Sequence, residues 1–486
     1  MSKSGSVHRF NLSTIWASLW IPLIVAIFLF LALQLEIPLL TFVPIGLIFL
    51  LISLYDVRIL IIPAAFLLQL SQEYWLGSFG LGLPVEPLLL ILLPISIMIM
   101  LKKQPWNPYP IAHSPLATLL FVHIVWIFFT ALLSEMPLIS IKFFLAKLWY
   151  VIPALIVFAV PVVEDTKTRR LILYAMIGGM TFVVLWFLFR YVEFGFALRK
   201  VNQALKPWAR NHVDFAVGLT LLFPYLILLL KNESNRTLKK LLFGILVLWI
   251  FSLVVSWTRA AWVASFLALA LIPIIRLRLF IPALFSGLLI TGFVIHFMTY
   301  KNYYMVFAPD PRYVRSHDDL ASHLEATVAF RDVSVAERIY RWLAGIEMWK
   351  EHPIAGFGPN TFYHFYDHYT VEAFRTWVSL NPERSDVHNY YLQLLIEQGI
   401  PGLLIWVALM ISSLLIAYKL MFRLSGFTRE LVIAAFFSLF MAYVHIFFSN
   451  QIEAISNGPI FWFGIGIIAY LHGVYLTNKT IQHISK

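Results

Sequence analysis

The stretch KKLLFGILVLWIFSLVVSWTRAAWVASFLALALIPII, residues 239–275, decides the fold class of this chain. Its two apolar runs, 239–256 and 259–275, each reach roughly the 17–25 residues that an α-helix needs to cross a bilayer. Only the turn Ser256-Trp-Thr-Arg259 lies between them. We therefore expect two antiparallel membrane-spanning helices joined by a tight turn.

Similar apolar runs fill most of the chain. Of its 486 residues, 60% are hydrophobic and 13% are charged, whereas soluble domains average about 45–50% and about 25%. The sequence predicts an all-α, polytopic transmembrane helical bundle of about 14 helices. The first run is too long for a signal-peptide core, and run 57–72 is marginal because it contains Pro63. The other runs are 13–35, 38–55, 57–72, 84–101, 114–133, 143–163, 169–191, 212–230, 279–299, 394–418, 430–448 and 458–476.

The distribution of Lys and Arg predicts the orientation. If both termini are cytoplasmic, the inside segments hold 19 of the 36 Lys and Arg residues, as the positive-inside rule requires. We attribute the net charge of +11 to this topology and expect no nucleic-acid partner. The remaining cations lie outside, where an anionic ligand would explain them. They are Lys142, Lys147, Arg190, Arg199, Lys200, Lys206, Arg210, Arg259 and nine more between residues 301 and 384.

Three regions follow from this pattern. Residues 1–299 are expected to form the first eleven helices, and residues 393–486 the last three. Residues 300–392 are the one long stretch without a spanning run, and they are expected to form an extracytoplasmic loop domain with short helices. This loop is rich in Tyr, Trp, Phe and His, which favours order over disorder, and it has a helical pattern around residues 335–350.

Several cations of the outer face are candidates for binding an anion. Arg259, at the end of a helix, could bind a phosphate through two parallel hydrogen bonds, or it could simply reach for interfacial water. Arg338 and Arg341 share one helix face, as an anion clamp or as ion-pair partners of Glu337 and Glu347. Arg210 lies just before the run 212–230 and follows several other cations in the sequence. It could be part of a basic rim that binds a diphosphate, or of an ordinary surface loop.

Histidines supply the other candidates. His388 stands at the extracytoplasmic mouth of a helix, with Asp386 before it, and could accept a proton from a substrate hydroxyl or serve as a cap. His364 and His368 have the four-residue spacing of a metal pair, but no Glu follows the first. We interpret them as ordinary interfacial histidines and expect no metal. Cysteine is absent, which excludes thiolate chemistry and cysteine-ligated metals.

Two further elements are structural on this interpretation. The segment His352-Pro-Ile-Ala-Gly-Phe-Gly-Pro-Asn360 lacks the Gly-Lys-Ser/Thr ending of a phosphate loop and predicts a tight turn. Gly399, Pro401 and Gly402 predict a kink inside the membrane, between a short entry helix and the main span that follows it.

Together these pieces resemble the superfamily of O-antigen ligases and O-antigen polymerases. Ser256-Trp-Thr-Arg-Ala-Ala-Trp262 resembles the Ser-x-Ser/Thr-Arg-Gly/Ala-Ala element of that family, with Ala after the arginine in place of the commoner Gly. A helix with Arg341, the turn from His352 to Asn360, and His388-Asn-Tyr-Tyr-Leu-Gln … Glu397-Gln-Gly-Ile-Pro-Gly402 follow in the family's order. The resemblance covers roughly residues 210–420.

The resemblance implies a metal-independent membrane glycosyltransferase of the GT-C type in a bacterial inner membrane, without a nucleotide cofactor. Its donor would be an undecaprenyl-diphosphate-linked glycan, and its acceptor a lipid A core, another glycan or a protein. The family's functional residues would fall on His388 and Arg259 as catalytic groups, and on Arg210, Arg259, Arg338 or Arg341 as diphosphate ligands. Attack opposite the leaving group would invert the anomeric centre.

Two alternatives stay open. A polymerase of the same superfamily would use the same donor with a glycan acceptor, and fourteen helices exceed the twelve usual in ligases. A lipid-linked-glycan transporter would have ionisable residues or broken helices near the bilayer midplane, in two related halves. The chain shows no such internal repeat, and we therefore favour the transferase.

Overall fold

The structure is a computed structural model, which describes residues 56–76, 79–301, 303, 333–375, 379 and 386–484. The predicted runs 13–35 and 38–55 lie outside the described residues. The chain divides into two units at Ile61, and the unit from Ile62 onward contains all of the described helices except the first turn of α3.

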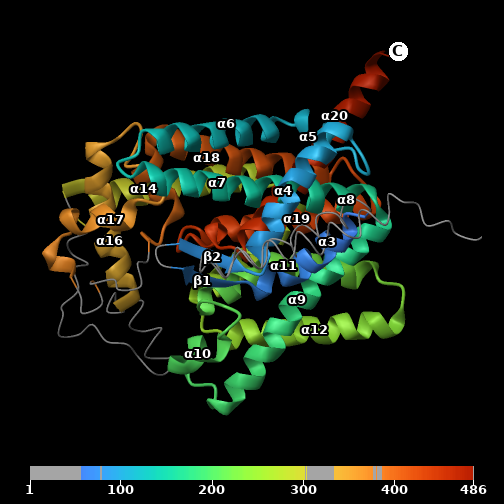
Figure 1. The fold of residues 1–486 in the computed structure, drawn as a ribbon, viewed down its shortest axis with the longest axis horizontal. Coiled ribbons are helices and arrows are strands. Elements are labelled where there is room, and N and C mark those ends of the chain that lie inside the picture. The colour runs from blue at the N-terminus through green and yellow to red at the C-terminus, as the bar shows by residue number, and fades with distance from the viewer. Residues whose placement is uncertain are drawn as a thin grey trace, which may run out of the picture. The chain divides into compact units, whose positions relative to one another are not determined.

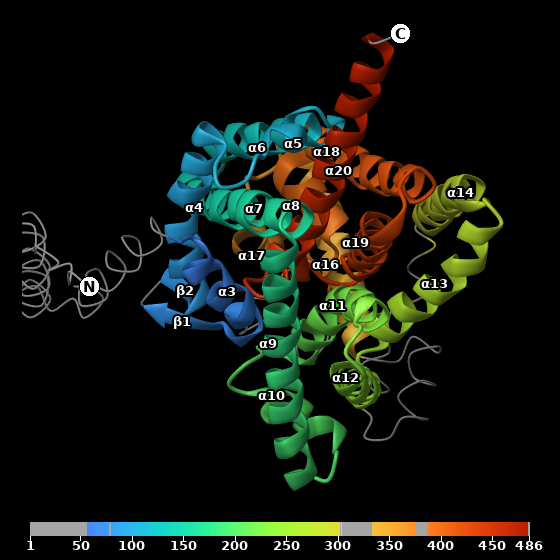
Figure 2. The same cartoon turned by 90° about the vertical axis from the view of Figure 1, so that its right-hand side faces the viewer.

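The described residues form an all-α polytopic bundle (Figures 1 and 2). Ten of their helices are long and apolar enough to cross a membrane, which confirms the predicted fold class. These ten are α4 (Val85–Lys102), α6 (Pro115–Leu132), α7 (Pro137–Pro153), α9 (Thr166–Glu193), α11 (His212–Asn232), α12 (Arg236–Val255), α13 (Arg259–Arg276), α18 (Tyr390–Met421), α19 (Gly426–His445) and α20 (Gly458–Ile484), and α14 (Phe280–Thr299) is a further apolar helix. Helix α7 continues through η3 (Ala154–Ala159) into α8 (Val160–Glu164); α5 (Tyr109–Ala112) and α10 (Val201–Leu205) are short.

The run 57–72 does not form the single spanning helix that the sequence predicts. Helix α3 (Arg58–Leu67) has ten residues, about 15 Å, and is followed by the 3₁₀ turn η2 (Leu68–Leu70). Strands β1 (Gln72–Leu76) and β2 (Phe79–Leu83) then form an antiparallel hairpin, between the predicted runs 57–72 and 84–101. The polar residues after Leu70 end the helical pattern, and the segment continues as extended chain.

Close backbone approach holds the bundle together. Helices α11 and α19 lie side by side, where Ser438 donates a hydrogen bond to the carbonyl of Leu221 at 2.8 Å. At Gly473 of α20, a Cβ atom would lie 1.7 Å from the carbonyl oxygen of Pro110. At Gly179, in the middle of α9, it would lie 1.9 Å from that of Phe66. Small residues at such crossings let helices pack closely in lipid, where burial of apolar surface gives little driving force.

The described part of the predicted loop domain is helical. Helix α16 (Val333–Glu351) confirms the pattern around residues 335–350, and α17 (Phe362–Phe365), η6 (Tyr366–Tyr369) and η7 (Glu372–Phe374) follow. Figure 1 shows α16 and α17 together at one end of the bundle. Their apolar side chains pack with the first turns of α18 in one buried cluster, which includes Tyr340, Met348, Phe362, Phe374 and Ile396.

The predicted turn and the predicted kink are both confirmed, and they form one feature. Helix α18 breaks at Gly399, whose φ is +69°, and the turn after α16 pairs with the broken backbone. The amide of Gly358 donates to the carbonyl of Glu397 at 3.0 Å, and the amide of Ile400 donates to that of Pro353 at 2.9 Å. Backbone groups exposed by the break therefore bond to the turn, as a broken helix in a membrane requires.

A buried carboxylate locks this feature from the side. Glu397 is only 2% exposed, and its oxygens accept hydrogen bonds from the amides of Asn360 at 2.8 Å and Phe362 at 3.1 Å. The side chain of Gln393 donates a third bond at 3.2 Å. Glu397 thus fixes the end of the turn, and through it the loop helices, against α18.

Candidate functional site

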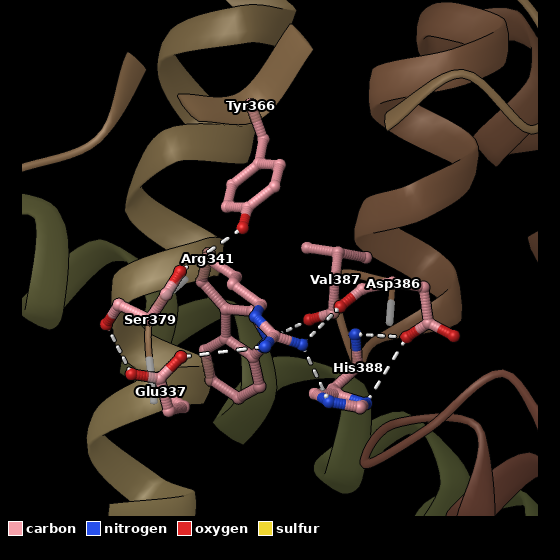
Figure 3. Close-up of polar contacts among 8 residues, drawn as sticks. Glu337, Arg341, Tyr366, Ser379, Asp386, Val387 and His388 are labelled. Atoms are coloured by element: carbon pink, nitrogen blue, oxygen red, sulfur yellow. Dashed lines mark hydrogen bonds and ion pairs between the residues drawn. The ribbon is translucent and has the colours of Figure 1, made fainter. Parts of the chain in front are cut away.

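His388 and Arg341 are in direct contact where the loop helices meet α18 (Figure 3). Arg341 points from α16 toward Asp386 and His388, which precede α18. Its Nη1 lies 2.9 Å from Nε2 of His388. Helix α18 starts behind Asn389, whose side chain accepts the amide of Leu392 at 3.0 Å. His388, with φ at +54°, is therefore not the cap of the helix but projects beside it.

The contact determines the protonation pattern of the imidazole. A guanidinium donates hydrogen bonds and accepts none, so Nε2 of His388 must supply a lone pair to Arg341. The proton of the neutral ring then lies on Nδ1, which is 3.3 Å from Oδ1 of Asp386. The same oxygen accepts the backbone amide of His388 at 2.7 Å. Asp386 thus orients the ring from one side and Arg341 from the other.

Asp386 stays ionised in this setting. Burial raises its pKa, but the hydrogen bonds from His388 and the positive charge of Arg341 lower the pKa by more than burial raises it. The pKa of Asp386 therefore lies below its ordinary value. An ionised carboxylate beside Nδ1 stabilises an imidazole that takes up a second proton at Nε2. The pair therefore has the electrostatics of a general base oriented by a carboxylate.

Arg341 has a second acidic neighbour on its own helix. Its Nη2 lies 3.6 Å from Glu337, one turn earlier, and both side chains are buried. Glu337 in turn accepts a hydrogen bond from Ser379 at 2.5 Å. An ion pair with Glu337 on a solvated helix was one of the two interpretations that the sequence left open; the structure contains this pair, but it is buried. Glu347 pairs with Lys350 instead.

Arg259 is the first residue of α13, in the tight turn that the sequence predicted between α12 and α13. The turn is anchored to two other helices. Trp257, at φ +59°, donates its indole N–H to the hydroxyl of Tyr191 on α9 at 3.0 Å. Thr258 donates to the carbonyl of His212, the first residue of α11, at 3.1 Å. These bonds fix the backbone from which the guanidinium of Arg259 projects.

The start of α11 lies between this turn and the His388 region. Arg210 is exposed and forms a long ion pair of 3.9 Å with Glu73, which contributes little to stability. Asp214, on the first turn of α11, lies close enough to Arg210 and to Asp386 to interact electrostatically with both. The first turns of α11, α13 and α18 are thereby neighbours. Arg338 is half-buried on α16, one turn before Arg341.

His364 and His368 do not share one α-helix. Helix α17 ends at Phe365, and His368 belongs to the 3₁₀ turn that follows, so their four-residue spacing is not that of an α-helical metal pair. Both are exposed. Among the residues that the structure describes, no group of three or more His, Asp or Glu side chains could hold a metal ion.

The sequence analysis counted Lys147 among the cations of the outer face, but the structure buries this side chain inside the bundle. Helix α7 starts at Pro137 rather than near residue 143, which places Lys147 about 15 Å along the helix, 2% exposed. Its Nζ lies 2.5 and 2.6 Å from the two oxygens of Glu453, in η8 (Gln451–Glu453), and Tyr390 donates to the same carboxylate at 2.5 Å. The sequence reasoning missed this network, because it joins residues 306 positions apart.

Part of the chain is similar to a known protein family. Residues 244–407 match the family model described as O-antigen ligase, which covers about a third of the chain. The match includes Arg259, Arg338, Arg341, His388 and Glu397, and it begins after Arg210. It confirms the resemblance to the O-antigen ligase superfamily, whose members transfer glycans in membranes. No curated protein matches the chain in the corresponding search.

Proposed function

We propose that this chain, whose residues 244–407 match the O-antigen ligase family, moves a glycan from an undecaprenyl-diphosphate carrier to an acceptor hydroxyl. The reaction takes place at the extracytoplasmic face of a bacterial inner membrane. The observation that carries the proposal is the contact of His388 with Asp386 and Arg341, in the matched region and next to the start of α11. This is a base and a set of cations at one end of the bundle.

Cations serve the leaving group in this mechanism. The bond between sugar C1 and the carrier diphosphate breaks with its electron pair on the diphosphate, which gains negative charge. A guanidinium forms two parallel hydrogen bonds with such an oxyanion and needs no metal ion to do so. Arg259, on a turn fixed to α9 and α11, is the principal ligand of the diphosphate. Arg338 and Arg210 contribute from α16 and from the loop before α11.

His388 serves the acceptor. Its Nε2 takes the proton of the attacking hydroxyl while Asp386 stabilises the imidazolium from the Nδ1 side. The ring is one-third exposed, so an acceptor can approach it. Attack from the face opposite the diphosphate inverts the anomeric centre. The lipid A core, a growing glycan or a protein hydroxyl would all fit this chemistry; a glycan acceptor would make the protein a polymerase.

The transporter alternative gains one observation from the structure. Lys147, Glu453 and Tyr390 form a polar cluster inside the bundle, where transporters bind their substrates. The cluster is an ion pair of Lys147 with Glu453 completed by the hydroxyl of Tyr390, which suits a structural role. We therefore keep the transferase as the proposed function.

The proposed function is tested with purified protein in detergent. Incubation with an undecaprenyl-diphosphate-linked oligosaccharide and a panel of acceptors should yield a glycosylated acceptor and free undecaprenyl diphosphate, both identified by mass spectrometry. A lipid core, an oligosaccharide and a peptide acceptor distinguish ligase, polymerase and protein transferase. Absence of any product, with glycan movement across proteoliposomes instead, would replace the transferase with the transporter.

The proposed topology has both termini and the α11–α12 turn in the cytoplasm, and the loop helices outside. Because the chain contains no cysteine, single cysteines report without background. Ala373→Cys, in the exposed turn η7, should label with a membrane-impermeant maleimide in intact cells whose outer membrane is permeabilised. Ser234→Cys, exposed between α11 and α12, should label only after the inner membrane is lysed. The reverse pattern would invert the topology.

Transfer is expected to survive removal of divalent cations. The guanidiniums of the proposed site take the role that a metal ion has in many diphosphate-dependent enzymes, and His364 and His368 are poorly arranged as ligands. Rates measured in excess EDTA and in added Mg²⁺ should agree within error. Loss of activity in EDTA that one particular divalent cation restores would show that a metal site is part of the mechanism.

A further inference from the structure

His388 cannot accept a proton while it is arranged as the structure shows. Its Nδ1 faces Asp386 at 3.3 Å, and its Nε2 lone pair is engaged by Nη1 of Arg341 at 2.9 Å. A proton placed on Nε2 would leave two donors, one on each of two cations, pointing at each other. Such an arrangement is repulsive, and more so in a partly buried site than in water. Arg341 must therefore leave Nε2 before the base can act.

We propose that Arg341 is a positioning residue that keeps His388 inactive until the donor diphosphate draws its guanidinium away. This inference rests on the proposed function, and it gives Arg341 a different task from Arg259. The diphosphate offers Arg341 a charged acceptor, which forms a stronger hydrogen bond than the neutral imidazole nitrogen does. Donor binding thereby frees the base, and acceptor activation follows it in a fixed order.

The geometry around Arg341 suits a small movement. The guanidinium is held on one side by Glu337 at 3.6 Å and on the other by His388 and the carbonyl of Asp386 at 3.1 Å. Glu337 is fixed in turn by Ser379. A rotation that keeps the contact of Nη2 with Glu337 and withdraws Nη1 from His388 releases the imidazole without leaving the buried carboxylate unpaired.

The backbone of His388 does not have to move in this step. Trp342, the neighbour of Arg341, donates its indole N–H to the carbonyl of Val387 at 3.0 Å. This bond connects α16 to the loop segment that contains His388. Asp386 keeps both of its bonds to His388. After the release, the acceptor hydroxyl gives its proton to Nε2, its oxygen bonds to C1, and the diphosphate leaves with the electron pair of the old bond.

The test reads the imidazole directly. Diethyl pyrocarbonate acylates a neutral imidazole nitrogen that has a lone pair available, and mass spectrometry of the peptide with His388 gives the rate. His368, exposed on the same chain, is the internal control. Undecaprenyl diphosphate without a glycan should accelerate acylation of His388 in the wild-type protein by about tenfold, as loss of one charge-assisted hydrogen bond allows, and leave His368 unchanged.

A double substitution removes the switch without leaving a buried charge alone. Glu337→Gln with Arg341→Met should acylate at His388 at the fast rate without the diphosphate, and the diphosphate should add nothing. Glu337→Gln alone, the matched control, should still respond. Protection of His388 by the diphosphate in the wild type, or a slow rate in the double variant, would overturn the proposal. Because no transfer is measured, an inactive transferase and a missing switch give different results.

Discussion

Arg259→Ala protein is expected to insert and purify normally and to transfer glycan about a hundredfold to a thousandfold more slowly than the wild type, as loss of one preorganised donor to a developing oxyanion does. Hydrogen bonds from the side chains of Trp257 and Thr258 hold the turn before Arg259 and remain in the variant, so the fold should survive. Arg259→Lys keeps the charge but loses the planar fork. It should therefore remain severely impaired, although less than the alanine variant.

His388→Ala should separate the two halves of the reaction. Its proposed partner is the acceptor, so the substitution should slow transfer strongly while donor affinity changes little. Arg259→Ala should instead weaken both. Transfer rate and binding of undecaprenyl diphosphate are measured for each variant after a monodisperse detergent profile is confirmed.

The matched control is Arg236→Ala. Arg236 is the first residue of α12, as Arg259 is of α13, but it is exposed at the opposite end of the bundle. Its loss should leave transfer unchanged. Wild-type rates in both Arg259→Ala and His388→Ala would show that the proposed site is not where transfer occurs.

Gly399→Ala should prevent the protein from folding into a stable, monodisperse form. A Cβ atom there would lie 2.0 Å from the carbonyl oxygen of Ile354 and 2.3 Å from its carbon, and neither backbone atom can move aside cheaply. With φ +69° and ψ −172°, Gly399 also lies in a backbone region that is essentially restricted to glycine, which adds a cost of about 1–3 kcal/mol for a residue with a side chain. The turn from His352 to Asn360 would be pushed off α18, and Glu397 would lose its buried partners.

Gly426→Ala tests a positive φ without a close contact. Gly426 has nearly the same φ, +58°, but a Cβ atom there would meet nothing within 4 Å. It should cost only about 1–2 kcal/mol, enough to lower the melting temperature by a few degrees. Detergent size-exclusion profiles and thermal melts followed by Trp fluorescence compare the two. Equal stability of the two variants would contradict the close contact at Gly399.

The fold class follows from composition and run length, because membrane helices need little more than about twenty apolar residues. The prediction of one spanning helix over residues 57–72 was wrong because the length of an apolar run does not determine its conformation. Pro63 and the polar residues after Leu70 allow a helix, a 3₁₀ turn and a strand in succession. The kink at Gly399 was predictable because Gly399, Pro401 and Gly402 lie close together, and Gly and Pro within a membrane-spanning helix are typical of a kink.

The site was predictable only in part. Sequence spacing places Arg338 and Arg341 on one face of α16, but it cannot tell which of them reaches another element. The contact between Arg341 and His388 joins residues 47 positions apart and depends on the packing of α16 against α18. Glu397 belongs to a motif that the sequence shows, but its structural role could not be predicted. Its partners are backbone amides, which any residue other than proline at positions 360 and 362 would supply.

The buried pair of Lys147 and Glu453 has a consequence for the order in which the protein is made. The ribosome delivers α7 to the membrane 306 residues before it delivers the carboxylate that neutralises Lys147. In the meantime this helix contains an uncompensated charge, which favours a shallow or loosely held position. Tyr390, two residues beyond His388, bonds to the same carboxylate. We therefore expect the surroundings of the histidine to mature last, after the final hairpin has inserted, so that an unfinished chain is an inactive one.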